Sequence, residues 1–163
     1  MEYQVRVDQV DPTMTAVVRR RAGQHELATV VPQACGEVWA FFRASQLPHP
    51  GRNLAVYLDG EINLECGVEV FQPFSGDGQV VYSSTPAGMV ATTTHLGPYN
   101  RLGEAHAAIL KWCSDRGHAL AGPNWEVYGH WIDDPSQLRT DVFYLLQPAG
   151  GRAADQSGEA STR

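Results

Sequence analysis

The sequence predicts an α+β protein made of two similar halves, each with antiparallel strands and one helix. Short motifs recur along the chain: NLAVY at 53–57 returns as NWEVY at 124–128, and FQP at 71–73 is matched by LQP at 146–148. Both pairs are about 70–75 positions apart, and each half shows the order strand, helix, strand, strand. Two copies indicate a duplication rather than a solenoid. We therefore expect both helices on the same side of the strands.

The first half covers about residues 1–75. Runs of β-branched residues with loose alternation predict strands at 14–21, 24–31, 53–60 and 66–73. A helix is expected at 32–45, because Pro32 suits a first helical position and Val38, Phe41 and Phe42 recur at helical spacing. The prolines at positions 48 and 50 end this helix.

The second half covers about residues 85–148, with strands expected at 90–96, 124–131 and 141–146. The strongest helical pattern of the chain lies at 98–116, and Gly117 suits its C-terminal cap. One face of this helix carries Tyr99, Leu102, His106, Ile109, Leu110 and Cys113. Residues 149–163 are small, polar and glycine-rich, which predicts a disordered tail after a single domain at 1–148.

Composition excludes several classes of protein. A net charge of -6 argues against a nucleic-acid surface, and no apolar run approaches the roughly 20 residues of a membrane helix. The N-terminus lacks the pattern of a signal or transit peptide, so we expect a cytoplasmic protein. The three cysteines form no CxxC pair and the six histidines show no ligand spacing, so neither a metal nor another cofactor is expected.

A glutamate stands in the middle of the aromatic strand predicted at 124–131. On a strand, Glu126, Tyr128 and His130 share one face, while Trp125, Val127 and Trp131 share the other. The face with the two tryptophans is the more apolar, so it is expected to pack under a helix.

The duplicate strand carries Ala55 where the second half has Glu126, so the architecture does not itself require a carboxylate there. Tyr57 takes the place of Tyr128, and the two tyrosines could flank a cleft where the halves meet. From the residue pattern alone, both a solvent-facing glutamate and a ligand-binding glutamate stay open.

From Thr85 onward the sequence resembles the GyrI-like small-molecule-binding domain, which also serves as the effector-binding domain of AraC-type and MerR-type multidrug regulators. The matching pieces are PAG at 86–88 before a strand, HLGPY at 95–99 at a helix start, Trp112 late in that helix, and WEVY at 125–128. The first half matches more loosely, and the resemblance covers about residues 1–148.

The resemblance implies a duplicated βαββ fold with pseudo-twofold symmetry and an aromatic-lined ligand cleft between the halves. A glutamate matching Glu126 commonly attracts lipophilic cations there, which aromatic faces and a partly buried carboxylate favour physically. The candidate ligand-binding residues are Glu126, Tyr128, Tyr57, Phe71, Glu69, Trp131 and His130. Phe71 and Glu69 are included because they alternate with Val68 and Val70, which is expected to bring them to the same cleft as Tyr57.

Three functions remain open at this stage. Many relatives carry a helix-turn-helix region ahead of this domain, and its absence here predicts a stand-alone protein without direct DNA contact. The lack of a long apolar run predicts no membrane contact. Such a protein would bind or sense lipophilic small molecules. As a hydrolase of cyclopropane-containing genotoxins, it would use Glu126 as general base and Tyr57 or Tyr128 as hydrogen-bond donor. The third possibility is a protein partner such as DNA gyrase.

Overall fold

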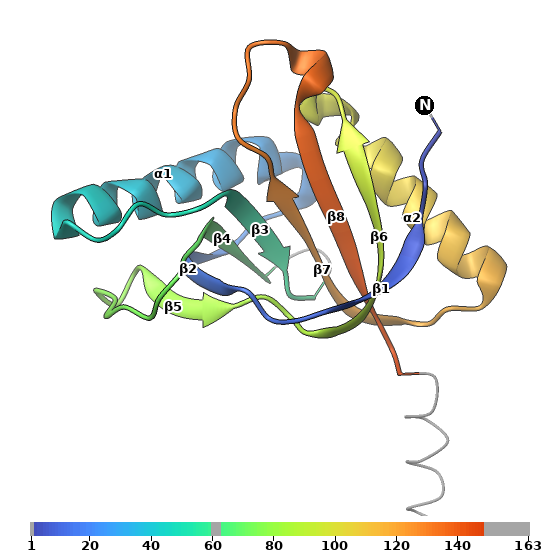
Figure 1. Cartoon of the computed structure of the whole chain (residues 1–163), viewed down its shortest axis with the longest axis horizontal. Coiled ribbons are helices and arrows are strands. Elements are labelled where there is room, and N and C mark those ends of the chain that lie inside the picture. The colour runs from blue at the N-terminus through green and yellow to red at the C-terminus, as the bar shows by residue number, and fades with distance from the viewer. Residues whose placement is uncertain (1, 60–62, 149–163) are drawn as a thin grey trace, which may run out of the picture.

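The computed structural model describes residues 2–59 and 63–148, which form an eight-stranded antiparallel sheet with two helices on one face (Figure 1). The first half comprises β1 (Arg6–Val10), β2 (Met14–Arg21), α1 (Leu27–Ser45), β3 (Asn53–Tyr57) and β4 (Asn63–Glu69). The second comprises β5 (Val81–Ser84), β6 (Gly88–Leu96), α2 (Leu102–Arg116), β7 (Leu120–Tyr128) and β8 (Arg139–Leu146). The tail predicted at 149–163 lies outside the described residues.

The order of the strands in the sheet confirms the predicted duplication. It runs β1-β6-β8-β7-β3-β4-β2-β5, so exchanging each strand with its counterpart in the other half reverses the order and changes nothing else. The two halves meet where β3 pairs with β7, and there Ala55 lies directly opposite Glu126. The equivalent positions of the two motifs thus face each other across the pseudo-twofold axis.

Two short strands escaped the sequence prediction. Strand β1 pairs with β6 and strand β5 pairs with β2, so each half lends one edge strand to the other. Both are four or five residues long and partly exposed, and such segments carry little periodicity.

The sheet is strongly curled. The short links at 11–13 and 85–87 join strands from opposite ends of the sheet order, and the Thr13 and Thr85 segments hydrogen-bond to each other at 2.8 and 2.9 Å. The face turned away from the helices therefore closes on its own side chains: Val17, Leu54, Val56, Val90, Trp125 and Val127.

The prediction that Trp125 and Val127 pack under a helix is wrong for this reason. The opposite face, which carries Glu126 and Tyr128, is the one that the helices cover, as the packing of Tyr128 into both helix-bearing core clusters shows. Curling of the sheet, rather than relative apolarity, decides which face each helix takes.

Helix α1 begins earlier than predicted. The strand expected at 24–31 is instead a 3₁₀ turn followed by the first turns of α1, and Pro32 lies inside the helix. Four of the buried residues of α1 correspond one by one to the buried residues of α2, at the same distance along the sequence that separates Asn53 from Asn124. They are Val31, Ala34, Val38 and Phe42 on α1, and Leu102, Ala105, Ile109 and Cys113 on α2.

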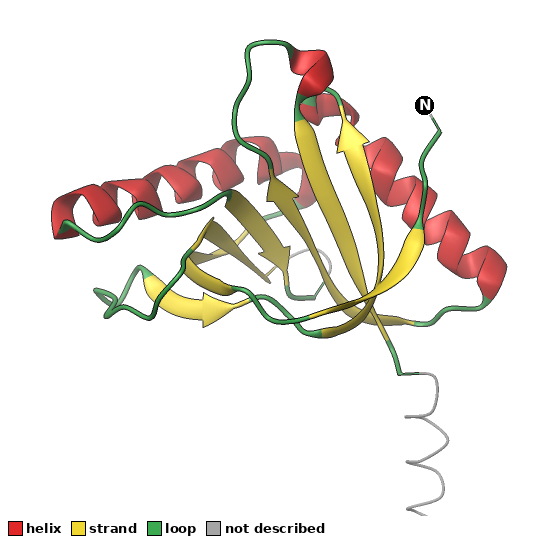
Figure 2. Cartoon of the chain, viewed as in Figure 1, coloured by secondary structure: helices red, strands yellow, loops and turns green. Residues whose placement is uncertain are grey.

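Both helices end in a left-handed residue, Gln46 after α1 and Gly117 after α2, again at this spacing. Figure 2 shows α1 and α2 diverging over the sheet rather than packing along one another. No helix in the described ranges is long and apolar enough to cross a membrane.

Candidate ligand-binding cleft

A cavity of about 1120 Å³ lies between the two helices, over the strands at the centre of the sheet. Helix α1 packs on β2 and β4 and helix α2 packs on β6 and β8, so the floor between them is left to β3 and β7. The lining is mostly apolar and aromatic, with contributions from both halves. Junctions of this kind are preferred sites for small molecules.

Glu126 lies on the floor of this cavity and is only 5% exposed. Its Oε1 accepts hydrogen bonds from the hydroxyls of Tyr57 at 3.1 Å and Tyr128 at 2.5 Å. Its Oε2 lies 2.5 Å from Nε2 of His106, on α2. The carboxylate is thus held by side chains from both halves and from a helix.

His106 connects this carboxylate to a third tyrosine. Its Nδ1 lies 2.7 Å from the hydroxyl of Tyr144 on β8. In the neutral form, Nε2–H donates to Glu126 and Nδ1 accepts from Tyr144; in the imidazolium form, Nδ1 donates instead. Both forms keep every hydrogen bond, so His106 can change charge without breaking the network.

The tyrosine hydroxyls of the cavity stay protonated at neutral pH and can donate hydrogen bonds. Burial, reinforced by the negative charge of Glu126, raises the pKa of Tyr57 and Tyr128 well above the ordinary value. The same two effects raise the pKa of Tyr144 to about 12. Glu126 therefore accepts hydrogen bonds from neutral hydroxyl groups.

Aromatic rings form the walls. Tyr99, at the entry to α2, meets Tyr128 edge to face, with ring centroids 5.8 Å apart. Trp39 of α1 is fixed by its indole N–H, which donates to Oδ1 of Asn53 at 2.7 Å. Trp131, in the loop after β7, lines the cavity and remains 67% exposed, which places it at the rim.

The structure brings four of the seven candidate residues together: Glu126, Tyr128, Tyr57 and Trp131 all line the cavity. Glu69, Phe71 and His130 do not, contrary to the expectation from the sequence.

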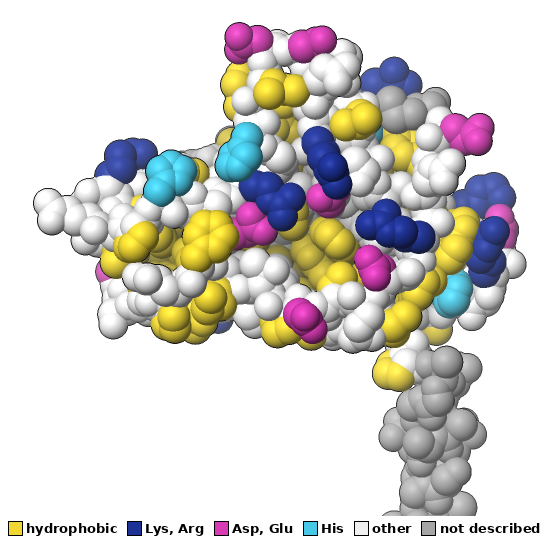
Figure 3. All heavy atoms as spheres, viewed as in Figure 1, with side chains coloured by type: hydrophobic (Ala, Val, Ile, Leu, Met, Phe, Trp, Pro, Cys, Tyr) yellow, Lys and Arg dark blue, Asp and Glu magenta, His cyan; other side chains and the backbone are white. Residues whose placement is uncertain are grey.

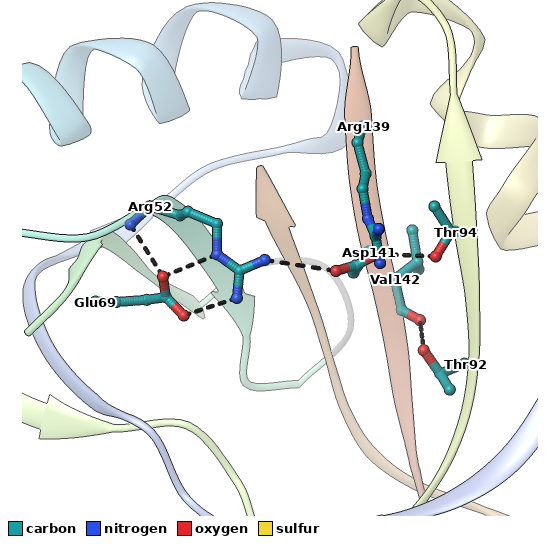
Figure 4. A network of polar contacts seen from close by, with 7 residues as sticks. All are labelled: Arg52, Glu69, Thr92, Thr94, Arg139, Asp141 and Val142. Carbon is teal, nitrogen blue, oxygen red and sulfur yellow. Dashed lines mark hydrogen bonds and ion pairs between the residues drawn. The ribbon is translucent and has the colours of Figure 1, made fainter. Parts of the chain in front are cut away.

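Glu69 binds Arg52 on the sheet face opposite to the helices, at 2.9 Å, as Figure 4 shows. The side chain of Phe71 is 74% exposed beyond the end of β4, and His130 is an exposed residue of the loop after β7. The alternation that was expected to bring Glu69 and Phe71 beside Tyr57 puts Glu69 on the other face, because Tyr57 pairs with Leu64 rather than with Glu65.

The site residues that sequence reasoning missed are His106, Tyr144, Tyr99, Trp39 and Asn124. A signal existed for one of them. His106 occupies the buried stripe of α2 between Leu102 and Ile109, where an ionisable side chain needs a buried partner.

The acidic and basic members of the cavity lining are Glu126 and His106 alone among the described residues. Within 2–59 and 63–148, no group of three or more His, Cys, Asp or Glu is placed to hold a metal ion. The chemistry available in the cleft is therefore one carboxylate, one imidazole, neutral hydroxyl and amide groups, and aromatic surface.

Comparison with solved structures shows the same fold in other proteins. The C-terminal domain of EcmrR superposes with a TM-score of 0.73 at 20% identity, covering 91% of this chain and 100% of that one. SAV2435 bound to tetraphenylphosphonium gives 0.63 at 11% identity, with coverages of 92% and 96%. A hydrolase from Listeria innocua gives 0.56 at 9% identity, with coverages of 88% and 92%.

A search of the curated proteins finds no significant match. The model of the GyrI-like small molecule binding domain, in contrast, matches residues 3–146, nearly all of the part that the structure describes. Fold, duplicated halves and the cavity between them agree with that match, so the chain belongs to the GyrI-like small-molecule-binding domain family.

Proposed function

We propose that this protein binds lipophilic cations, including aromatic ones, in the cleft, with Glu126 as their charge partner. The observation that carries the proposal is a carboxylate 5% exposed on the floor of an aromatic cavity of about 1120 Å³. Its contacts are neutral tyrosine hydroxyls and His106, which is a cation only when protonated. The site thus offers negative charge without a permanent counter-ion.

A delocalised cation fits this environment for two physical reasons. The faces of aromatic rings attract positive charge, and a bulky cation loses little hydration when it enters an apolar cavity. SAV2435, whose structure contains tetraphenylphosphonium, shares the fold, and its ligand is a molecule of this chemical class.

The test is a titration of the protein with tetraphenylphosphonium, followed by quenching of tryptophan fluorescence, since Trp39 and Trp131 line the cleft. Tetraphenylborate has nearly the same shape and the opposite charge, so it serves as the matched probe. We expect saturable binding of the cation and rejection of the anion. In Glu126→Gln the cation should lose at least about tenfold in affinity, and the preference over the anion should shrink.

Equal binding of both ions by the wild-type protein would contradict the proposal. So would cation binding that Glu126→Gln leaves unchanged. The glutamine keeps the size of the side chain, and near-ultraviolet circular dichroism would show whether the variant retains its packing.

A second candidate, a hydrolase of cyclopropane-containing electrophiles, is favoured by the pairing of Glu126 with two hydroxyl donors in one cavity. Glu126 would take a proton from a water that bonds to a cyclopropane carbon. The broken ring bond would send its electron pair to a conjugated carbonyl, which Tyr57 or Tyr128 would stabilise by hydrogen bonding. Product formation in excess over protein, lost in Glu126→Gln, would distinguish this from binding alone.

The cytoplasmic location, the absence of direct DNA contact and a protein partner such as gyrase remain predictions from the sequence. A supercoiling assay with no small molecule present tests the last of these. Inhibition of gyrase by the protein alone would favour a partner over a ligand.

A further inference from the structure

Asn124 is a polar residue of the cleft that nothing so far assigns. Its side chain is on β7 two residues before Glu126 and therefore on the same face, and the residue is only 7% exposed. It pairs across the sheet with Tyr57 on one side and Tyr144 on the other, and it lines the cavity with both. Among the residues that the structure describes, none hydrogen-bonds to its amide.

The other half of the protein shows what this amide lacks. Asn53 is the counterpart of Asn124, and its Oδ1 accepts the indole N–H of Trp39. At the sequence spacing that relates the two asparagines, the counterpart of Trp39 is Leu110. Leu110 has no polar hydrogen in its side chain and is 40% exposed. The duplicated floor keeps the asparagine, but the second helix no longer supplies its partner.

A buried amide without a partner is costly, because it has left water and gained nothing in return. The amide of Asn124 avoids this cost because it faces the cavity, where water or a bound molecule can reach it, and it is not among the fully buried polar atoms without a partner. It can both donate and accept a hydrogen bond. Next to Glu126, which already attracts positive charge, its free N–H groups suit an uncharged oxygen.

We propose that the amide of Asn124 donates a hydrogen bond to an acceptor on the ligand, so that the cleft prefers lipophilic cations that carry a carbonyl oxygen about 7 Å from the charged centre. Residues two apart on a strand are about 7 Å apart, which sets the approximate distance between the cation and this oxygen. This inference rests on the proposed function, since it assumes that a cation occupies the cleft beside Glu126.

Two probes that differ only at the ketone oxygen test the inference. They are (4-oxopentyl)triphenylphosphonium and its methylidene isostere (4-methylpent-4-enyl)triphenylphosphonium, in which a CH₂ group replaces the ketone oxygen. We expect the wild-type protein to bind the ketone about fivefold more tightly, as one net hydrogen bond allows. In Asn124→Leu the ratio should fall to one, mainly through weaker binding of the ketone.

Asn53→Leu is the matched control, because its amide is already engaged by Trp39. That variant should keep the ratio between the two probes even if it weakens both. Retained binding of the methylidene probe by Asn124→Leu shows that the cleft is intact.

The possible failures are separable. A ratio of one in the wild-type protein, or a fivefold ratio that survives in Asn124→Leu, overturns the role of Asn124 and leaves the proposed function standing. If neither phosphonium binds, the proposed function fails and this inference fails with it.

Discussion

Replacing His106 by glutamine tests whether the protonation of His106 makes cation binding in the cleft depend on pH. Nε2 of His106 lies 2.5 Å from Oε2 of Glu126, so a protonated His106 is itself a cation paired with this carboxylate and competes with a cationic ligand. Glutamine also offers an N–H donor to the carboxylate but cannot change charge. We therefore expect cation binding by the wild-type protein to weaken as the pH falls, and binding by His106→Gln to depend less on pH.

The magnitude follows from the distances. A bound cation in contact with Glu126 would lie about 6 Å from the imidazolium, and two such charges repel by about 3 kcal/mol at an effective dielectric constant near 20. The protonated protein should thus bind the cation about 100-fold more weakly than the neutral one. Because the bound cation disfavours the protonated form of His106, cation binding should be linked to release of a proton.

Other groups around the cavity do not interfere in this range. Burial raises the pKa of Tyr57, Tyr99, Tyr128 and Tyr144, and it raises that of Cys35 on the facing helix to about 11. All five stay neutral between pH 5 and 8. In the described part of the cavity lining, Glu126 is the one acidic or basic side chain besides His106.

Isothermal titration with tetraphenylphosphonium between pH 5 and 8 measures both effects. Repeating it in two buffers of different ionisation enthalpy counts the protons released. His118→Gln is a matched control, because this histidine stacks on Trp112 and does not line the cavity. A flat pH profile in the wild-type protein, or an equal slope in His106→Gln, would refute the reasoning.

Two further predictions concern stability and thiol reactivity. Arg52→Met should lower the free energy of unfolding, measured in urea titrations, by about 1–2 kcal/mol. The reason is that partly exposed Arg52 bridges Glu69 in one half and Asp141 in the other (Figure 4). Binding of tetraphenylphosphonium should be unaffected. Burial opposes ionisation of Glu69, but hydrogen bonds from Arg52 and its charge hold the pKa of Glu69 below its ordinary value. The resulting stabilisation is present above the ordinary pKa of a glutamate and is lost as the pH falls through the lowered pKa of Glu69. In Arg52→Met the free energy of unfolding should therefore fall less steeply as the pH is lowered. An unchanged pH dependence would contradict this. Cys35 and Cys66, whose pKa values burial raises to about 11 and about 12, should resist a thiol reagent at pH 8 until the protein is unfolded, and rapid labelling of the native protein would show that the helix α1 side opens readily.

The polar network of Figure 4 pairs charged side chains on the face away from the helices. Figure 3 shows basic and acidic side chains interspersed there rather than gathered by sign. Asp141 accepts from Thr94 at 2.8 Å and from Arg139 at 3.1 Å, and it also lies 3.6 Å from Arg52. These groups satisfy one another, whereas the carboxylate of Glu126 faces an open cavity.

The sequence was sufficient to predict the duplication, because motif spacing survives without any knowledge of contacts. It also predicted that Glu126, Tyr128 and Tyr57 share a cleft, and the three lie on one face of paired strands and line the cavity. Their role in binding stays a prediction. The sequence could not predict which face the helices cover. That depends on the curl of the sheet, which arises from links between strands that are distant in the sheet order.

Residues contributed by the helices were hard to predict for a related reason. His106 and Trp39 approach the floor only because α1 and α2 are set apart over β3 and β7, and no local pattern encodes that separation. Glu69 shows the opposite failure. Its alternation with Val68 was recognised, but the register that sends Glu69 to the far face depends on pairing across strands.

The duplication explains how a symmetric framework produces a directional site. The strand order, the buried helix stripes and the pair Tyr57 and Tyr128 are repeated, so each half contributes equivalent elements to the cavity. The acidic and basic groups of the cavity are not repeated. At the spacing that relates the halves, Cys35 corresponds to His106 and Ala55 to Glu126. A cationic ligand of the proposed kind would therefore meet a more apolar half and a more polar half, and we expect its charged end to lie at the second. In this proposal, the duplicated framework shapes the cavity, and the difference in chemistry between the halves orients the bound molecule.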